Sequence, residues 1–438
     1  MATEERLPET SAAVLRSRLA TGVLSAVDLA KACLARIDAR EDEVRAWAWY
    51  DRQCALYDAE RLDDLRLSGV PLGPLHGLPV GVKDIIDTRG IPTENGCSLD
   101  SDRIPGDDAE IVSRLKAAGA LIIGKTVTTE LAFLHPGKTR NPCNLAHTPG
   151  GSSSGSAAAV ADGMVPLAVG TQTGGSVVRP ASFCGVVGFK PSFGAIPQRG
   201  VLIQSPSLDT IGVFARDPVG AALLADVLMG TGSIKTPLAE LVRPPSFAVV
   251  YPPGWDLADP DLARAFDAFC DGLGDQAQRA PLPAVFSDAA AQRARINAAD
   301  MAYHYARYMD AGGSHLGPET RAAITQGRAL SAPDYLAARA YQAALPSALV
   351  PLFADCDALL CPAAPGPAPK GLESTGDSIF NGLWTMAGTP AVTLPLLASP
   401  SGLPMGVQLI AAPGADQRLM QVADWLWKAS GRDGGVPS

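Results

Sequence analysis

Residues 78–86 read Leu-Pro-Val-Gly-Val-Lys-Asp-Ile-Ile, an apolar stretch of strand length that carries one lysine and one aspartate. Short apolar runs of this kind are typical of a strand buried on both faces of a sheet. Helical patterns at 108–118 and 156–162 alternate downstream with strand-like runs at 120–123 and 165–169. This alternation predicts an α/β fold: a large mixed, mostly parallel twisted sheet with helices on both faces.

The rest of the chain extends this core rather than adding a separate domain. We find no internal repeat and no low-complexity linker, so we expect one domain over residues 1–438. Its expected parts are an N-terminal helical hairpin (1–65), a catalytic core (70–250), a helical insertion that shapes the pocket (255–345) and a C-terminal part of the core (355–438).

The composition excludes several function classes. Of the 438 residues 47% are hydrophobic, which is enough for a large core, and the net charge of −9 argues against a nucleic-acid surface. The eight cysteines lack paired spacing, and Cys356 and Cys361 are too isolated for a zinc site. No signal peptide or membrane span is recognisable, so we expect a cytoplasmic protein, with a homodimer allowed.

One motif match is misleading. Residues 119–126 read Gly-Ala-Leu-Ile-Ile-Gly-Lys-Thr, which fits the phosphate-binding P-loop pattern letter for letter. A P-loop requires a glycine-rich turn that follows a strand and opens a helix. Here the intervening residues form a strand that follows a helix, so we reject phosphate binding at this stretch.

Lys83 is the first candidate for chemistry. Lysine is rarely buried without a partner, yet this one lies among apolar strand residues. Desolvation disfavours the ammonium form, so burial lowers the pKa of a lysine and makes its amine a usable base. An ion pair with Asp84 is the structural alternative, but adjacent strand residues point to opposite faces.

Two glycine- and serine-rich stretches supply a candidate nucleophile. Residues 150–156 read Gly-Gly-Ser-Ser-Ser-Gly-Ser, and residues 170–176 read Gly-Thr-Gln-Thr-Gly-Gly-Ser. The backbone amides of Thr173, Gly174, Gly175 and Ser176 would converge on an oxyanion, with Ser176 presented to the same carbon. None of the five histidines lies in either stretch. Taken alone, each stretch also fits a structural turn or a helix cap.

Together these features resemble the amidase signature family. The resemblance rests on residues 76–84, 149–158 and 170–176, continues at 184–191 and 207–212, and returns weakly at 388–395. It implies the amidase signature fold and a catalytic triad without metal or cofactor. In that triad Ser176 is the nucleophile, Ser152 is the bridging serine held by a cis Gly151–Ser152 peptide, and Lys83 is the base.

The chain departs from the commonest family pattern at two positions. Many members carry an aspartate where this chain has Gln172, and an arginine two residues after the nucleophile, whereas Arg179 stands three residues after Ser176. This version is similar to malonamidase-type members, in which such an arginine binds a substrate carboxylate. A guanidinium suits that role. The alternative, with equal weight, is that Arg179 braces its own loop through hydrogen bonds to backbone carbonyls.

The resemblance implies an amidohydrolase that acts on linear amides. The leading interpretation is a stand-alone amidase that cleaves C–N bonds of small amides through an acyl-enzyme, and carbamates (urethanes), anilides and esters are further candidate substrates. The alternative is the glutaminase subunit of a tRNA-dependent amidotransferase. Arg179, Gln172 and the acidic chain count against that alternative. A third interpretation, a binding protein with a dead site, is disfavoured by the complete triad.

Overall fold

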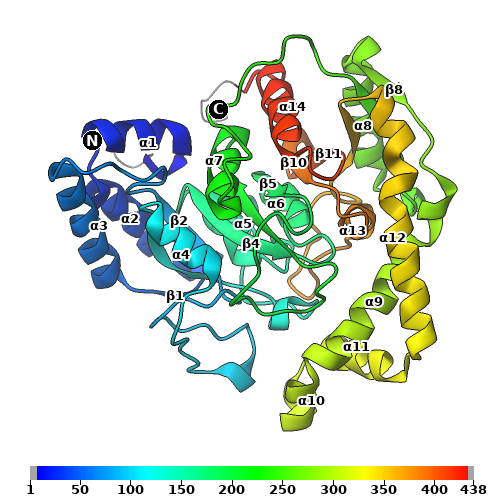
Figure 1. Cartoon of the computed structure of the whole chain (residues 1–438), viewed down its shortest axis with the longest axis horizontal. Coiled ribbons are helices and arrows are strands. Elements are labelled where there is room, and N and C mark those ends of the chain that lie inside the picture. The colour runs from blue at the N-terminus through cyan, green and yellow to red at the C-terminus, as the bar shows by residue number, and fades with distance from the viewer. Residues whose placement is uncertain (1–6, 433–438) are drawn as a thin grey trace.

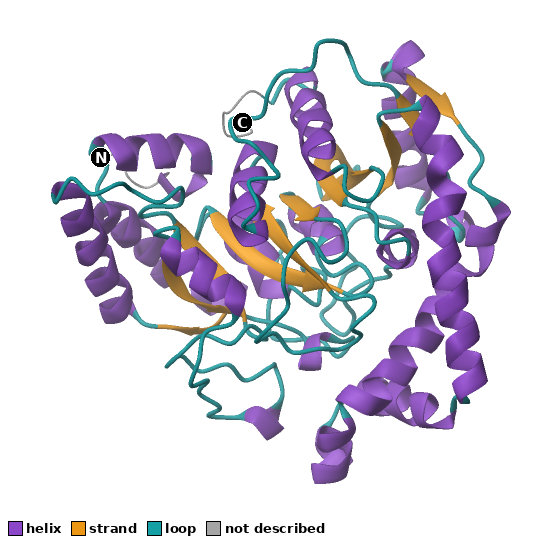
Figure 2. Cartoon of the chain, in the orientation of Figure 1, coloured by secondary structure: helices purple, strands orange, loops and turns teal. Residues whose placement is uncertain are grey.

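The structure is a computed structural model that describes residues 7–432. An eleven-stranded sheet runs through the middle of the molecule, with helices around it (Figures 1 and 2). From one edge to the other, its strands are β1 (Trp47–Tyr50), β3 (Leu121–Thr126), β2 (Pro79–Lys83), β4 (Leu167–Gln172), β6 (Thr210–Ala215), β5 (Val187–Lys190), β10 (Ala391–Ala398), β11 (Pro404–Ile410), β9 (Ala358–Pro362), β7 (Phe247–Val249) and β8 (Ala277–Arg279).

Helices cover this sheet as the alternating pattern predicts. Two of them, α5 (Ser154–Ala161) and α6 (Val178–Cys184), pack together against the central strands. A second pair, α7 (Pro218–Met229) and α14 (Asp416–Ala429), packs against the same part of the sheet. Nearly all side chains of β2, β4, β5, β6 and β11 are buried, which explains why these strands read as continuous apolar runs.

The strand directions differ from the expectation in one respect. The mixed sheet is confirmed, but six of the ten strand pairings in the described chain are antiparallel and four are parallel. The parallel pairs include β2 with β3 and β2 with β4. A short connection at 399–403 joins β10 to β11, and strands joined so closely pair antiparallel.

The N-terminal segment is more than the expected helical hairpin. It contains α1 (Ala12–Thr21), α2 (Ala26–Val44) and α3 (Arg52–Leu67), and the sequence Trp47-Ala-Trp-Tyr50 forms β1 at the sheet edge between α2 and α3. Aromatic residues favour strands, and β1 pairs antiparallel with β3. The segment is therefore tied into the main sheet by backbone hydrogen bonds as well as by helix packing.

The insertion at 255–345 is mostly helical and lies at the right of Figure 1, but it also contains β8, the edge strand of the main sheet, which the sequence did not predict. It contains α8 (Pro260–Gly272), α9 (Ala289–His304), α10 (Ala306–Gly312) and α11 (Pro318–Ala329), and it runs into α12 (Ala332–Asp355). Besides α11 and α12, α9 contacts α13 (Ile379–Met386), which follows β9. The insertion is thus connected to the C-terminal part of the core through α9.

The rejected P-loop match forms a strand. Residues 121–126 are β3, which follows α4 (Glu110–Ala117), and the Lys125 amine is buried. Lys125 donates hydrogen bonds to the carbonyl of Ile86 and to the hydroxyls of Thr88 and Thr93. The backbone here is committed to the sheet and leaves no phosphate cradle. Within residues 7–432, no helix is both long and apolar enough to cross a bilayer.

Candidate active site

Strand pairing places Lys83 beside the second serine-rich stretch. β2 and β4 are parallel neighbours with Val82 opposite Val169, so their carboxyl ends lie at the same edge of the sheet. Lys83 is the last residue of β2, and Thr171 lies near the end of β4. Residues 150–153 reach the same edge because α5 begins directly after them. Gly155 permits this close approach, since a Cβ there would lie 2.2 Å from the carbonyl oxygen of Ala46.

Three hydroxyl groups surround the buried amine of Lys83. Its Nζ lies 2.8 Å from Oγ of Ser152, 3.0 Å from Oγ of Ser153 and 2.9 Å from Oγ1 of Thr171. The Ser153 hydroxyl in turn donates to the Thr171 carbonyl, at 3.1 Å. The peptide between Gly151 and Ser152 is cis, as the resemblance implies. Sequence reasoning identified Ser152 but missed Ser153 and Thr171.

The surroundings of Lys83 disfavour its charged form. The side chain is fully buried, and desolvation holds its pKa well below the ordinary lysine value, although the charge of Asp209 opposes this shift. Lys83 forms no ion pair with any residue in the range 7–432. A neutral amine has only two hydrogens for three hydroxyl oxygens, so one hydroxyl must donate to the nitrogen lone pair. The hydrogen of Ser153 is already used, which leaves Ser152 or Thr171 as the donor.

The candidate nucleophile lies on a turn that Gln172 organises. The Gln172 Oε1 atom accepts hydrogen bonds from the backbone N–H groups of Val177, at 2.8 Å, and Val178, at 3.0 Å. Its Nε2 group donates to Oγ1 of Thr385, which itself donates to the carbonyl of Gly174 at 2.7 Å. A neutral amide therefore supplies both the acceptor and the donor that hold the ends of the turn.

Ser176 lies at the crest of this turn, half-buried, and lines a cavity of about 520 Å³. Its hydroxyl makes no hydrogen bond to any residue that the structure describes, and this includes Ser152. The expected contact from Ser176 to Ser152 is therefore not formed here. Catalytic hydrogen bonds are often long or absent without substrate, so Ser176 remains the candidate nucleophile.

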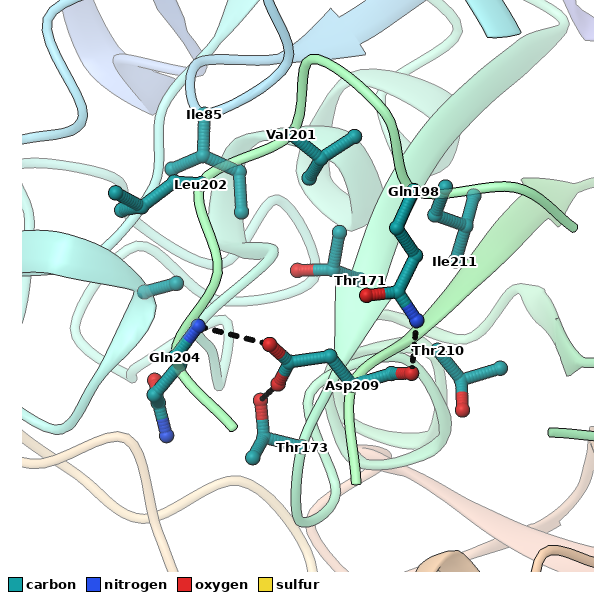
Figure 3. A pocket seen from close by; sticks show the side chains of 11 residues that line it. Ile85, Thr171, Thr173, Gln198, Val201, Leu202, Gln204, Asp209, Thr210 and Ile211 are labelled. Atoms are coloured by element: carbon teal, nitrogen blue, oxygen red, sulfur yellow. Dashed lines mark hydrogen bonds between the residues drawn. The ribbon is translucent and has the colours of Figure 1, made fainter. Parts of the chain in front are cut away.

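The turn also carries free backbone donors. The N–H groups of Gly174, Gly175 and Ser176 have no acceptor among residues 7–432. Thr173 is held in place because its hydroxyl donates to Asp209 at 2.6 Å, and Asp209 also accepts from the backbone N–H group of Gln204 (Figure 3). The backbone N–H group of Ser205 donates to the same carboxylate. Burial raises the pKa of Asp209 to about 6. Free donors on a fixed turn are what an oxyanion site requires.

Arg179 is buried beside this turn. It makes hydrogen bonds that brace the neighbouring loop, which was the alternative to binding a substrate carboxylate. Its Nη2 atom donates to the carbonyl of Gly151, at 2.7 Å, and to Oγ1 of Thr375, at 3.1 Å. Burial lowers the pKa of Arg179 to about 10. Its Nε has no partner in the described chain, although the side chain lines the same cavity as Ser176.

A second arginine, Arg293 of α9, lines this cavity. Sequence reasoning assigned no residue of the insertion to the site, because α9 carries no glycine- or serine-rich motif and Arg293 resembles any other arginine of an alanine- and arginine-rich helix. Asp209 lies within a stretch that carried the family resemblance, so a positional signal was present there without a role attached to it.

We predict that Gln172→Leu lowers kcat about ten- to a hundredfold with a smaller change in KM, because the turn that carries Ser176 loses its anchor. The free energy of unfolding should fall by about 1–3 kcal/mol, since two buried N–H groups lose their acceptor. Urea unfolding and steady-state kinetics measure the two effects. Gln172→Glu keeps the acceptor and should lose less activity than Gln172→Leu, and the reverse order would contradict this role.

Comparison with known proteins agrees with this geometry. A family model described as Amidase matches residues 28–420. The chain belongs to the amidase family. An amidase of known structure superposes with a TM-score of 0.87 at 30% identity and covers 96% of this chain and 99% of its own. The A subunit of the glutamyl-tRNA(Gln) amidotransferase of Symbiobacterium thermophilum is 34% identical over 95% of this chain and 96% of its own length. The A subunit of the same enzyme from Geobacter sp. is 32% identical over 93% of this chain and 95% of its own length.

Membership of the amidase family gives the class of reaction. The family and its neighbours of known structure, which include a peptide amidase that is 27% identical with a TM-score of 0.82, identify this amidase as an amidohydrolase. The amidase fold expected from the sequence is likewise confirmed.

Proposed function

We propose that this amidase hydrolyses the C–N bond of small amides through an acyl-enzyme on Ser176, with Ser152 and Lys83 as the proton relay. The observation that carries the proposal is the buried Lys83 amine at 2.8 Å from the Ser152 hydroxyl, with no carboxylate in contact with it among the described residues. A neutral amine in that position can accept the proton of the serine, so the site needs no histidine as a base.

In the proposed acylation step the Ser176 oxygen attacks the carbonyl carbon. Its proton passes to the oxygen of Ser152, whose own proton passes to the amine of Lys83. The carbonyl oxygen becomes an oxyanion, which the free N–H groups of Gly174, Gly175 and Ser176 stabilise. The relay requires the Ser176 hydroxyl to turn toward Ser152, and no hydrogen bond to a described residue opposes that rotation.

Collapse of the tetrahedral intermediate breaks the C–N bond. The ammonium of Lys83 returns its proton through Ser152 to the departing nitrogen, because an amide anion leaves poorly. The released ammonia or amine exchanges for water. The same relay then deprotonates water, which attacks the ester on Ser176 and releases the carboxylic acid with the enzyme restored. Esters, anilides and carbamates offer the same carbonyl to the same groups, so their turnover belongs to this proposal.

The decisive experiment traps the acyl-enzyme. We expect the purified protein to release ammonia from short primary amides, and mass spectrometry of enzyme quenched with acid in the steady state to find the acyl mass on the peptide that contains Ser176. An acyl group on any other residue, or turnover of amides with neither this adduct nor any hydroxamate formed when hydroxylamine is added as a competing acceptor, would refute the proposed nucleophile.

A second candidate, the glutaminase subunit of a tRNA-dependent amidotransferase, is favoured by a specific observation. The curated relatives at 34% and 32% identity are named as the A subunit of glutamyl-tRNA(Gln) amidotransferase, and they match over nearly the whole of both chains. Glutamine is itself a small primary amide, so the chemistry at Ser176 is unchanged. The two candidates differ in whether glutamine is the preferred amide and whether partner subunits are needed.

A panel of amides separates the two candidates. If the protein is a stand-alone amidase, the purified chain should hydrolyse non-amino-acid amides faster than glutamine. If it is part of an amidotransferase, glutamine should be preferred, and affinity purification from its own host should recover further subunits that raise the rate of ammonia release. Equal rates on all substrates, without any added partner, would speak for the stand-alone enzyme.

A further inference from the structure

Arg293 places a free guanidinium in the cavity. Among residues 7–432 it makes neither a hydrogen bond nor an ion pair, and its Nε is buried without a partner. Burial lowers its pKa, and only the charge of Asp377 opposes that shift. A guanidinium has five donors, and leaving them unsatisfied in a partly buried site is costly unless a ligand takes them. The guanidinium of Arg293 is therefore suited to bind an anion.

The position of Arg293 is built into the backbone around it. A Cβ on Gly174 would lie 2.9 Å from its Nη1, and a Cβ on Gly382 would lie 2.4 Å from its Nε. The guanidinium thus lies directly against the turn that carries Ser176, two residues after Gly174. Arg293 and Ser176 line the same cavity, so one small substrate can contact both.

Arg179, the arginine that the sequence suggested for this role, already donates two hydrogen bonds to the protein through its Nη2 atom, and its buried Nε has no partner in the described chain. Its Nη2 atom holds the Gly151 carbonyl and the Thr375 hydroxyl, so its guanidinium positions the loop before Ser152. The residues that line the cavity include only one carboxylate, the exposed Asp377, against the two arginines. The cavity therefore carries an excess of positive charge, which favours an anionic substrate.

We propose that Arg293 is the specificity-determining residue of this enzyme and binds a carboxylate on the acyl side of the substrate, so that the preferred substrates are monoamides of short dicarboxylic acids. This inference rests on the proposed amide hydrolysis at Ser176. Malonamate, succinamate and glutaramate are the simplest members of the class. Glutamine belongs to it as a glutaramate that carries an ammonium group, which the carboxylate of Asp377 is suited to bind.

Kinetics with Arg293→Gln test the proposal. We expect kcat/KM for the best of the three monoamides to fall about 100-fold, on the scale of one charge-assisted arginine–carboxylate contact, mostly through KM. For butyramide, which has no carboxylate, kcat/KM should fall much less than for the monoamide, because no charge-assisted contact with the substrate is lost. Arg293→Lys should recover part of the selectivity because it restores the charge without the fork.

Arg295→Gln is the matched control, since Arg295 lies on the same helix, is exposed, and among residues 7–432 makes a single hydrogen bond, of 3.3 Å, to Gln292. It should leave both substrates unaffected. Arg179→Gln provides the contrast: because Arg179 positions the Gly151 loop, that variant should slow butyramide and the monoamides alike. Loss of selectivity in Arg179→Gln but not in Arg293→Gln would overturn the proposal.

A binding experiment separates this inference from the proposed hydrolysis. Calorimetry with malonate, succinate and glutarate and the Ser176→Ala protein should show binding that Arg293→Gln removes and Arg295→Gln retains. If no amide is hydrolysed but this pattern is found, the hydrolysis proposal fails and the carboxylate site stands. If amides are hydrolysed but the Arg293→Gln variant binds the diacids as the parent does, the carboxylate site fails alone.

Discussion

Ser176→Ala is expected to lower kcat on the order of 10⁵-fold or more, the scale found when a serine nucleophile is removed from a hydrolase. The loss should be specific to chemistry. Because the Ser176 hydroxyl is half-buried and has no hydrogen-bond partner among the described residues, its removal leaves no buried group unsatisfied. The melting temperature should therefore stay within a few degrees of that of the parent.

Ammonia release measured over hours at high enzyme concentration determines the residual rate. Ser113→Ala is the matched control, since Ser113 is an exposed serine on α4. Residual activity above about one per cent in Ser176→Ala, with fresh protein and no contaminating hydrolase, would show that another residue forms the covalent bond to the substrate.

Lys83→Ala is expected to be nearly as severe, with kcat lower by about 10⁴-fold, because within residues 7–432 the amine of Lys83 is the only base that contacts the Ser152 hydroxyl. The substitution leaves a space where the amine was, so added methylamine or ethylamine should restore part of the rate. Lys138→Ala, at an exposed lysine, is the control and should behave as the parent does. Parental rates in Lys83→Ala at neutral pH would rule out the relay.

The pH dependence gives an independent test of the same residue. The relay needs Lys83 as the free base, so activity must rise as the pH increases through the pKa of this amine and level off above it. Burial holds that pKa well below the ordinary lysine value of 10.5. The rise should therefore be complete well before the pH reaches that ordinary value in the parent. In Lys83→Ala with added amine, it should follow the pKa of the amine instead.

Local sequence patterns predicted the elements of the core but not their directions. The apolar runs at β2 and β4 and the helical patterns at α4 and α5 are each set by neighbours along the chain, and all four were predicted. The direction in which two strands pair depends on the connection between them, so the antiparallel majority was missed. The four-residue strand β1 was missed because it is short and lies between two helices.

The site divides in the same way. Lys83, Ser152 and Ser176 could be predicted because each lies in a stretch whose composition is unusual for its surroundings. The contacts of Ser153 and Thr171 with Lys83 join residues 70 and 88 positions apart, and no local pattern announces them. Arg179 shows most clearly what sequence reasoning cannot reach. Its spacing from Ser176 is visible in the sequence, but the groups that accept hydrogen bonds from its Nη2 atom are not.

The origin of Arg293 in the helical insertion has an evolutionary consequence. The groups proposed to break the bond come from the sheet edge and the starts of α5 and α6, whereas the group proposed to choose the acid comes from α9, more than a hundred positions later in the chain. Mutation or recombination in that insertion can change the substrate specificity of the enzyme while its catalytic residues stay the same. Relatives with the same serines and lysine should then hydrolyse different amides, according to which side chains their insertion contributes to the cavity.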